Sequence, residues 1–280
     1  MKISAAQVKE LREKTGAGMM ACKEALAETG GDLPAAEVIL QKKGLDRADN
    51  RAERETLEGV IAVRVRAEDG FRGALLLQVF CETDFVARNE EFIAFAQDVL
   101  ESVITSGFQL RPELYEEKRA LLSAQMGENI RVGELGGVSC SEPVVVGTYL
   151  HSDRRIGAAV ALGEKDAYYI KDDRVDEIKE IARDIAMHAV AMKPLYQVEK
   201  LITGAERAAQ RDIFEAQVRE SGKPEKLWDR IVEGKMGKWV AAQCLMTQPF
   251  VKDPSLTVGE YLKEKGVEFR GCSWRGLTAV

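Results

Sequence analysis

The sequence predicts an α+β protein with helices at its N-terminus and paired strands in its middle. Three observations carry this prediction: amphipathic helical patterns fill residues 1–45, two apolar hairpins are each followed by a helix, and a helical hairpin occupies 205–243. The 280 residues suffice for roughly two domains. With 45% apolar and 31% charged residues, the composition is that of a globular protein.

The charge balance argues against nucleic acid and membranes as direct partners. Asp and Glu number 46 against 40 Lys and Arg, and the net charge of −6 does not attract phosphate backbones or anionic lipids. No apolar run approaches the ~20 residues that span a bilayer. The first residues lead directly into a helical pattern rather than a targeting peptide, so we expect a cytoplasmic protein.

The chemistry-bearing residues indicate neither a metal site nor a cofactor site. Five widely spaced cysteines lack the paired spacing of zinc ligands, and the two histidines are scattered, so we expect buried, reduced thiols and no cofactor. His188 lies on an apolar helical face and is predicted to be a core histidine. The residues concerned are Cys22, Cys81, Cys140, Cys244, Cys272, His151 and His188.

Residues 1–45 are predicted to form a three-helix unit. Ser4 and Gln7 fit a capping box for a first helix that ends at Thr15, and a second helix follows at 19–28. Asp32 caps a third helix, which is expected to stop before Gly44. The polar residues 46–57 are either a solvated helix or a linker.

The segment 16–21 formally matches a dinucleotide fingerprint. That fingerprint must follow a buried strand, whereas this segment follows an amphipathic helix. We therefore reject a nucleotide-binding interpretation of it.

Residues 58–142 are predicted to form a first α+β subdomain with a small antiparallel sheet. Strands at 59–65 and 73–81 flank a turn at Asp69–Gly70. Asn89 is expected to cap the next helix, at 89–106. A further helix at 112–126 and a third strand at 130–132 complete the unit.

Residues 143–204 and 244–280 are predicted to repeat this plan as a second subdomain. Strands at 144–150 and 156–162 precede a helix over 175–189, whose apolar residues share one face. Thr257 is expected to cap a short helix that reaches residue 265. A strand at 267–269 would then close the second sheet.

The helical hairpin at 205–243 consists of helices at 205–220 and 225–243, separated by a Gly- and Pro-containing turn. We expect Ile213 with Ala216, and Leu227 with Ile231, to form its seam. Its tryptophans are predicted to be seam or core residues. They are Trp228 and Trp239.

The segment Thr83-Asp84-Phe85-Val86 places a carboxylate beside a phenyl ring where an apolar strand gives way to a helix. Such a corner can reach into a partner. Alternatively, Phe85 packs back on its own helix as a hydrophobic staple while Asp84 or Thr83 satisfies loop amides. Sequence alone leaves both interpretations open.

Several segments in order along the chain together resemble the bacterial translation elongation factor Ts family. The resemblance implies a ubiquitin-associated-like three-helix domain, a core of two α+β subdomains and a coiled-coil hairpin. The segments are 8–20 with 22–26, then 83–86, Met126-Gly127-Glu128-Asn129-Ile130, 185–188, 221–224 and 248–251.

The resemblance also implies an activity: guanine-nucleotide exchange on the GTPase elongation factor Tu, in its GDP-bound and nucleotide-free states, with no bond made or broken. Asp84 and Phe85 would intrude near the magnesium and phosphate site of that GTPase, while Thr83 and Val86 hold the corner. The N-terminal unit would dock on the nucleotide domain. Candidate docking residues, each either core or interface, are Leu11, Arg12, Thr15, Met19 and Met20.

The sequence departs from the family at two places. Ala21 stands where members often have Asp, so one charged contact or cap is expected to be missing. Longer members continue beyond 269 as a strand and a terminal helix, and we expect no such helix here. In some members the hairpin mediates contacts between copies, so self-association through 205–243 is a further expectation.

Two rival classes remain. A metabolic enzyme would need convergent acid, base or metal groups, and the sequence offers no such cluster. An adaptor would use the three-helix unit alone.

Overall fold

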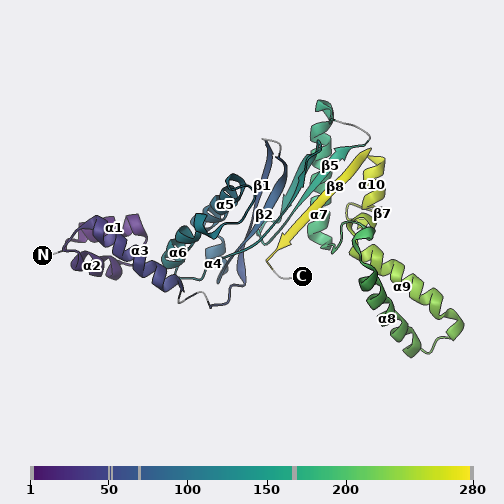
Figure 1. Cartoon of the computed structure of the whole chain (residues 1–280), viewed down its shortest axis with the longest axis horizontal. Coiled ribbons are helices and arrows are strands. Elements are labelled where there is room, and N and C mark those ends of the chain that lie inside the picture. The colour runs from purple at the N-terminus through teal and green to yellow at the C-terminus, as the bar shows by residue number, and fades with distance from the viewer. Residues whose placement is uncertain (1–2, 50, 52, 69–70, 166–168, 278–280) are drawn as a thin grey trace.

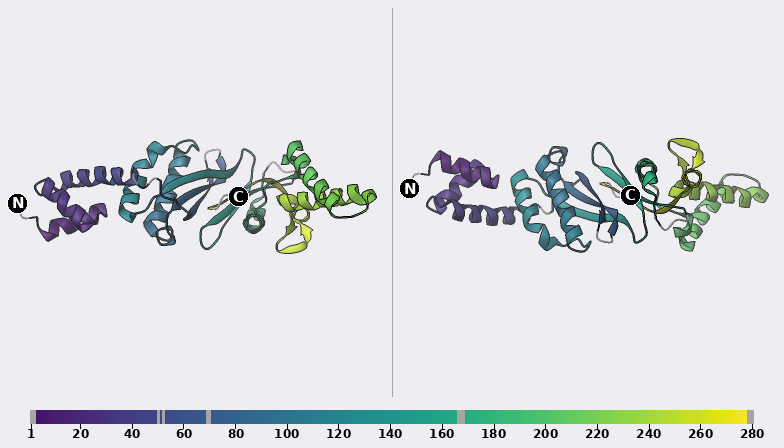
Figure 2. Two further views of the ribbon diagram at one scale, coloured as in Figure 1. Left: turned by 90° about the horizontal axis from the view of Figure 1, so that it is seen from below. Right: turned by 90° about the horizontal axis from the view of Figure 1, so that it is seen from above.

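The computed structural model describes residues 3–49, 51, 53–68, 71–165 and 169–277 (Figure 1). It is an elongated molecule with an N-terminal helical unit at one end, a helical hairpin at the other and two sheets between them (Figure 2). The predicted α+β class is confirmed. None of the described helices has the length and apolar character needed to cross a membrane.

The N-terminal unit consists of α1 (Ala5–Thr15), α2 (Met19–Glu28) and α3 (Leu33–Asp49). The predicted capping box is present, with Gln7 N donating to Ser4 Oγ at 3.2 Å and Ser4 N donating to Gln7 Oε1 at 3.1 Å. Leu11, Cys22 and Leu26 are fully buried between the helices. These contacts form a small separate core.

The predicted end of the third helix before Gly44 is wrong, because α3 continues through Gly44 to Asp49. A glycine within a helix costs only about 1 kcal/mol relative to alanine. The later part of α3 packs along α6 (Glu116–Met126), and this tertiary contact offsets the cost (Figure 1). The first four residues of the polar run after residue 45 are therefore helical, and the remaining described residues before Glu58 are not.

The first sheet is antiparallel in the order β1-β2-β3, with β1 (Glu58–Glu68), β2 (Phe71–Cys81) and β3 (Arg131–Cys140). The helix α5 (Glu90–Thr105) covers one face and buries Phe92 against the strands. Asn89 caps α5 as predicted, since its Oδ1 accepts from Glu91 N at 2.8 Å. The predicted turn at Asp69–Gly70 lies outside the described residues.

The third strand exists as predicted but is much longer than the predicted 130–132. The prediction is too short because glycines interrupt the apolar pattern of the strand. A Cβ at Gly133 would lie 2.5 Å from the Phe80 ring, and one at Gly137 would lie 2.5 Å from the carbonyl oxygen of Ala74. Glycine is therefore what lets β3 approach β2. In the sequence the same glycines resemble loop residues.

The second sheet is antiparallel in the order β4-β5-β8, with β4 (Val145–Leu150), β5 (Ile156–Glu164) and β8 (Val267–Gly276). The predicted closing strand is confirmed and extends beyond Phe269. The helix α7 (Val175–Met192) packs on this sheet. Thr257 caps α10 (Val258–Glu264), as expected.

The two sheets face each other. Ile61, Leu76 and Phe80 of the first sheet pack against Ala159 and Ala161 of the second in one buried cluster. The order of layers is therefore helix, sheet, sheet, helix, with α5 and α7 outermost (Figure 1).

The hairpin helices are α8 (Gly204–Glu220) and α9 (Trp228–Gln243). Part of the predicted seam is wrong, because Ile213, Ala216 and Leu227 are exposed. The actual seam on α8 is rotated by one helical position. There it consists of Phe214 and Val218. On α9 the seam contains Ile231 and both tryptophans, as predicted, together with Val232 and Met236.

Smaller elements complete the chain. They are the one-turn helix α4 (Asp84–Ala87), the paired β6 (Pro249–Phe250) and β7 (Asp253–Thr257), and 3-10 helices at Pro112–Leu114, Asp172–Arg174, Glu199–Leu201, Glu225–Leu227 and Leu245–Thr247.

Candidate partner-binding corner

The segment singled out in the sequence forms the one-turn helix α4 between β2 and α5. Thr83 is its N-cap, and the Thr83 hydroxyl accepts from Val86 N at 3.5 Å. Val86 and Ala87, on the inner side of α4, are buried in the core of the first subdomain. Asp84 lies on the surface, where one carboxylate oxygen is 3.0 Å from Nη2 of Arg88.

Phe85 points away from this core. Its side chain is 83% exposed, the highest value among the large apolar residues that the structure describes. The hydrophobic-staple interpretation is therefore wrong. A ring exposed to this degree contributes little to its own fold and is accessible to a partner.

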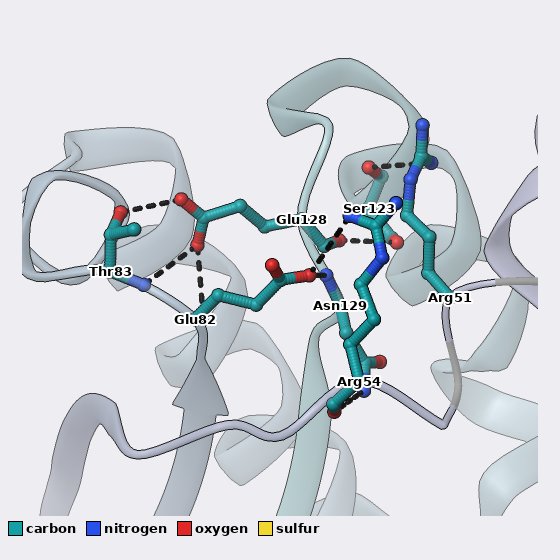
Figure 3. A network of polar contacts seen from close by, with 7 residues as sticks. All are labelled: Arg51, Arg54, Glu82, Thr83, Ser123, Glu128 and Asn129. Carbon is teal, nitrogen blue, oxygen red and sulfur yellow. Dashed lines mark hydrogen bonds and ion pairs between the residues drawn. The ribbon is translucent and has the colours of Figure 1, made fainter.

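Four residues anchor the base of this corner, and we call them the carboxylate clasp: Glu82, Thr83, Glu128 and Asn129 (Figure 3). One carboxylate oxygen of Glu128 accepts from the backbone N–H groups of Glu82 and Thr83, both at 3.0 Å. The other accepts from the Thr83 hydroxyl at 2.5 Å. In return, Glu82 Oε1 accepts from Asn129 N at 2.6 Å, so each segment caps the backbone of the other.

The clasp extends to the end of α6 and to the chain between α3 and β1. Ser123 Oγ donates to the carbonyl oxygen of Glu128 at 2.6 Å, and Asn129 Nδ2 donates to the Arg54 carbonyl at 2.8 Å. Longer contacts of 3.4 Å join Arg54 Nη1 to Glu82 Oε1 and Arg51 Nη1 to the Ser123 carbonyl (Figure 3). Three chain segments thus meet under α4.

The sequence identified α4 but assigned no role to Glu128 or Asn129. In the sequence their segment, 126–130, carries only a family resemblance. A local signal was available: Gly127 ends α6 in a left-handed conformation, so the polar pair that follows lies at a helix-to-strand corner. Nothing in the sequence says that this corner faces Thr83.

Cys81, directly before the clasp, is a protonated thiol. Burial raises its pKa to about 12, and the negative charges of Glu128, Asp84 and Glu82 add to the effect. Its Sγ donates to the Thr83 carbonyl at 3.2 Å. The thiol therefore supports the corner and is not a nucleophile at neutral pH.

No group of three or more His, Cys, Asp or Glu side chains within the described part of the chain is arranged to hold a metal ion. His188 is fully buried, as predicted, and four of the five cysteines are buried with all five thiols free.

The five N-terminal candidates fall into two groups. Leu11 is fully buried and belongs to the core of the three-helix unit, while Thr15 is partly buried and its hydroxyl donates to the Leu11 carbonyl at 2.7 Å. Arg12 is exposed, and the side chains of Met19 and Met20 are 56% and 66% exposed. Only this second group presents its side chains to solvent.

The loop between α1 and α2 rests on α6. A Cβ at Gly16, where φ is +64°, would lie 2.7 Å from the Gln125 side chain. A cleft of about 390 Å³ adjoins this contact and is lined in part by Thr15, Gly18 and Gln125. Ala21, the departure from the family pattern, also lines it, and α2 has no side-chain N-cap.

The geometry defines an α+β protein with a core of two facing sheets and an exposed ring on a turn anchored by hydrogen bonds. The family model described as Elongation factor TS matches residues 82–274. Elongation factor Ts of Methylococcus capsulatus is 42% identical over 276 residues, covering 95% of this chain and 89% of that protein.

The Thioalkalivibrio sulfidiphilus protein of the same name is 40% identical over 279 residues, with 96% of this chain and 90% of that protein covered. Elongation factor Ts of Treponema denticola is 37% identical over 273 residues, covering 97% and 94%. The chain belongs to the elongation factor Ts family, and the resemblance drawn from its motifs is confirmed.

Proposed function

We propose that this chain promotes GDP release from elongation factor Tu by inserting the Asp84–Phe85 corner beside the magnesium and phosphate site of that GTPase. Elongation factor Ts proteins are nucleotide exchange factors that catalyse no covalent step, and cytoplasmic translation is where they act. The observation that supports the corner is the 83% exposed ring of Phe85 on a one-turn helix whose base is anchored by hydrogen bonds.

The physical basis of the proposal is competition for the same elements of the GTPase. A GTPase holds its nucleotide largely through the phosphates and Mg²⁺. An aromatic wedge that displaces the surrounding loops lowers nucleotide affinity tenfold for about every 1.4 kcal/mol of lost contact. By linkage the nucleotide weakens binding of the exchange factor by the same factor, so GTP can expel it afterwards.

The three-helix unit, residues 1–45, would supply affinity rather than displacement. Arg12, Met19 and Met20 are exposed and can reach the nucleotide domain of the GTPase, whereas Leu11 serves the core of the unit and Thr15 caps the preceding turn of backbone. Exposed methionines suit such a role because the side chain is flexible and polarizable.

The test is release of fluorescent GDP from elongation factor Tu, measured with and without the chain. Phe85→Ala should lower the exchange rate by about tenfold or more, as expected of a buried aromatic anchor at an interface. Its matched control is Tyr169→Ala, which removes another ring that is 66% exposed, from the second subdomain. Normal exchange by Phe85→Ala would contradict the proposal.

We also propose that two copies associate through the hairpin. Ile213 and Leu227 are 50% and 39% exposed there and are not needed by its seam. A stable self-interface buries about 1,200 Å² or more in total. Ile213→Lys should then lower the sedimentation coefficient, because the variant would be monomeric where the wild type is a dimer. A monomeric mass for both the wild type and the variant would rule the contact out.

A further inference from the structure

We propose that Glu128 is a positioning residue for nucleotide exchange. It acts through Thr83 to hold the Asp84–Phe85 corner in the one orientation that enters the GTPase. The inference rests on the function proposed above and extends it to a residue 45 positions away in sequence from the Thr83 it contacts.

The direction of the Phe85 ring is set by the backbone that carries it. Because its ring is 83% exposed, no packing of its own side chain sets its direction. The backbone of α4 must do so, yet α4 spans only Asp84–Ala87. A helix this short is not stable by itself. Its geometry therefore depends on the groups that anchor its ends.

Val86 and Ala87 anchor one side by burial in the core. They fix how deeply α4 sits but leave its N-terminal edge to polar contacts. That edge carries the N–H groups of Glu82 and Thr83 and the Thr83 hydroxyl, and the Glu128 carboxylate accepts from all three, at distances between 2.5 and 3.0 Å. Hydrogen bonds to an ionised acceptor are about twice as strong as neutral ones.

The Thr83 hydroxyl transmits this anchoring to α4. Since its hydrogen is donated to Glu128 Oε1, its lone pairs are left to face Val86 N, from which it accepts at 3.5 Å. The cap of α4 is thus oriented by Glu128. Without the carboxylate the hydroxyl is free to rotate, and the turn that carries Phe85 loses its fixed start.

Glu128 is itself held in place. Ser123 Oγ donates to its carbonyl at 2.6 Å, and the next residue, Asn129, is 4% exposed and donates its backbone N–H to Glu82 Oε1 at 2.6 Å. The carboxylate therefore projects from a backbone that is fixed on both sides. A site that must work within about 0.5 Å needs such a supporting shell.

Three substitutions separate geometry from charge. Glu128→Gln keeps the length and an acceptor oxygen for the two backbone N–H groups, while its amide can donate to the Thr83 hydroxyl. Glu128→Asp keeps the charge but draws the acceptor back by one methylene. Glu128→Ala removes the acceptor, and Glu117→Ala removes an exposed carboxylate of α6 as the matched control.

The measurements are GDP release from elongation factor Tu at a series of factor concentrations, and thermal melts of each variant. Glu128→Ala and Glu128→Asp should lower the maximal exchange rate by about tenfold or more, since small misplacements of a working group cost that much. Glu128→Gln should stay within about threefold of the wild type and Glu117→Ala should match it. The half-saturating concentration should change far less, because the three-helix unit still docks.

A double variant shows whether Glu128 acts through the ring. Phe85→Ala combined with Glu128→Ala should exchange no more slowly than Phe85→Ala alone, because residues that act as a unit are not additive. Fully additive losses would overturn the inference. So would a lowered melting temperature with a normal maximal rate, which would make Glu128 purely structural, or a Gln variant as impaired as Asp. Should Glu128→Ala fail to fold, the Asp and Gln variants carry the same comparison.

The two proposals fail in different ways. If Phe85→Ala exchanges slowly while Glu128→Ala and Glu128→Asp exchange normally, the corner is right and the positioning role is wrong. If Phe85→Ala exchanges normally, the proposed corner is wrong and the role of Glu128 falls with it.

Discussion

The two subdomains of the core share one plan but place their main polar networks in opposite environments. Each has a three-stranded antiparallel sheet crossed by a long helix, α5 in the first and α7 in the second. The first sets its carboxylate clasp near the surface, beneath an exposed ring. The second centres its network on the fully buried His188. One network fixes a feature that faces outward, and the other fixes a core.

This network joins α7 to the residues on either side of β6. His188 Nε2 lies 3.0 Å from Gln248 Oε1, and Val251 N donates to His188 Nδ1 at 3.2 Å. These partners assign the neutral tautomer with its proton on Nε2, since the amide oxygen can only accept and the backbone N–H can only donate. The Phe250 ring stacks on Tyr261 with centroids 4.4 Å apart.

The largest expected difference between the two subdomains is in how much Phe250 and Phe85 contribute to the free energy of unfolding. Phe250 is 1% exposed, whereas Phe85 is 83% exposed. Phe250→Ala should lower the free energy of unfolding by about 3–5 kcal/mol through a cavity in the core. Phe85→Ala should change it by less than about 0.5 kcal/mol. Urea unfolding of both variants checks this, and equal losses would show that Phe85 is structural.

The next largest effect is a loss of folding stability in acid, which arises from the network around the buried His188. Burial lowers the pKa of His188 below its usual 6.5, with the Gln248 contact opposing in part. The unfolded chain takes up this proton first, so the stabilisation present above pH 6.5 is lost as the pH falls through the lower native pKa.

His188→Gln should cost about 1–3 kcal/mol at pH 7 by disturbing the two hydrogen bonds of the buried ring. It should also lose less additional stability than the wild type between pH 7 and pH 5, as measured by urea unfolding. An identical acid response in both proteins would show that His188 does not titrate in this range.

The smallest expected difference is in the reactivity of two buried thiols, one in each subdomain. Burial raises the pKa of Cys81 and of Cys272 to about 12. Neither should react appreciably with a thiol reagent at pH 8 in the folded protein, and the partly exposed Cys140 should react first.

These thiols also set a stability trend at high pH. A cysteine in the unfolded chain loses its proton near pH 9, while both native thiols keep theirs to about 12. Stability should therefore fall as the pH rises above about 9, where the unfolded state binds fewer protons. Fast modification of Cys81 in the native protein would show that the clasp opens readily.

Local signals in the sequence determined where most elements begin. The caps Ser4, Asn89 and Thr257 each satisfy backbone N–H groups within a few residues of themselves, and all three lie where they were predicted. Apolar periodicity located the strands of both hairpins and the helix after each. The position of the Asp84–Phe85 corner followed from the same signals.

Contacts between distant segments decided the rest. The extension of α3 past Gly44 depends on α6, and the length of β3 depends on the close approach of β2. The choice of residues in the α8–α9 seam depends on how the two helices pack, which their weakly amphipathic sequence pattern does not specify. Whether Phe85 packed inward or pointed outward was likewise undecided by its neighbours in sequence.

The carboxylate clasp shows most clearly the difference between local sequence signals and contacts between distant segments. The cap that Thr83 provides is local, because its hydroxyl accepts from the backbone N–H of Val86 three residues on. Glu128 reaches that same hydroxyl from 45 residues away. Periodicity and capping are properties of short stretches of chain, whereas a bond between Thr83 and Glu128 exists only once β2, α6 and β3 have packed together.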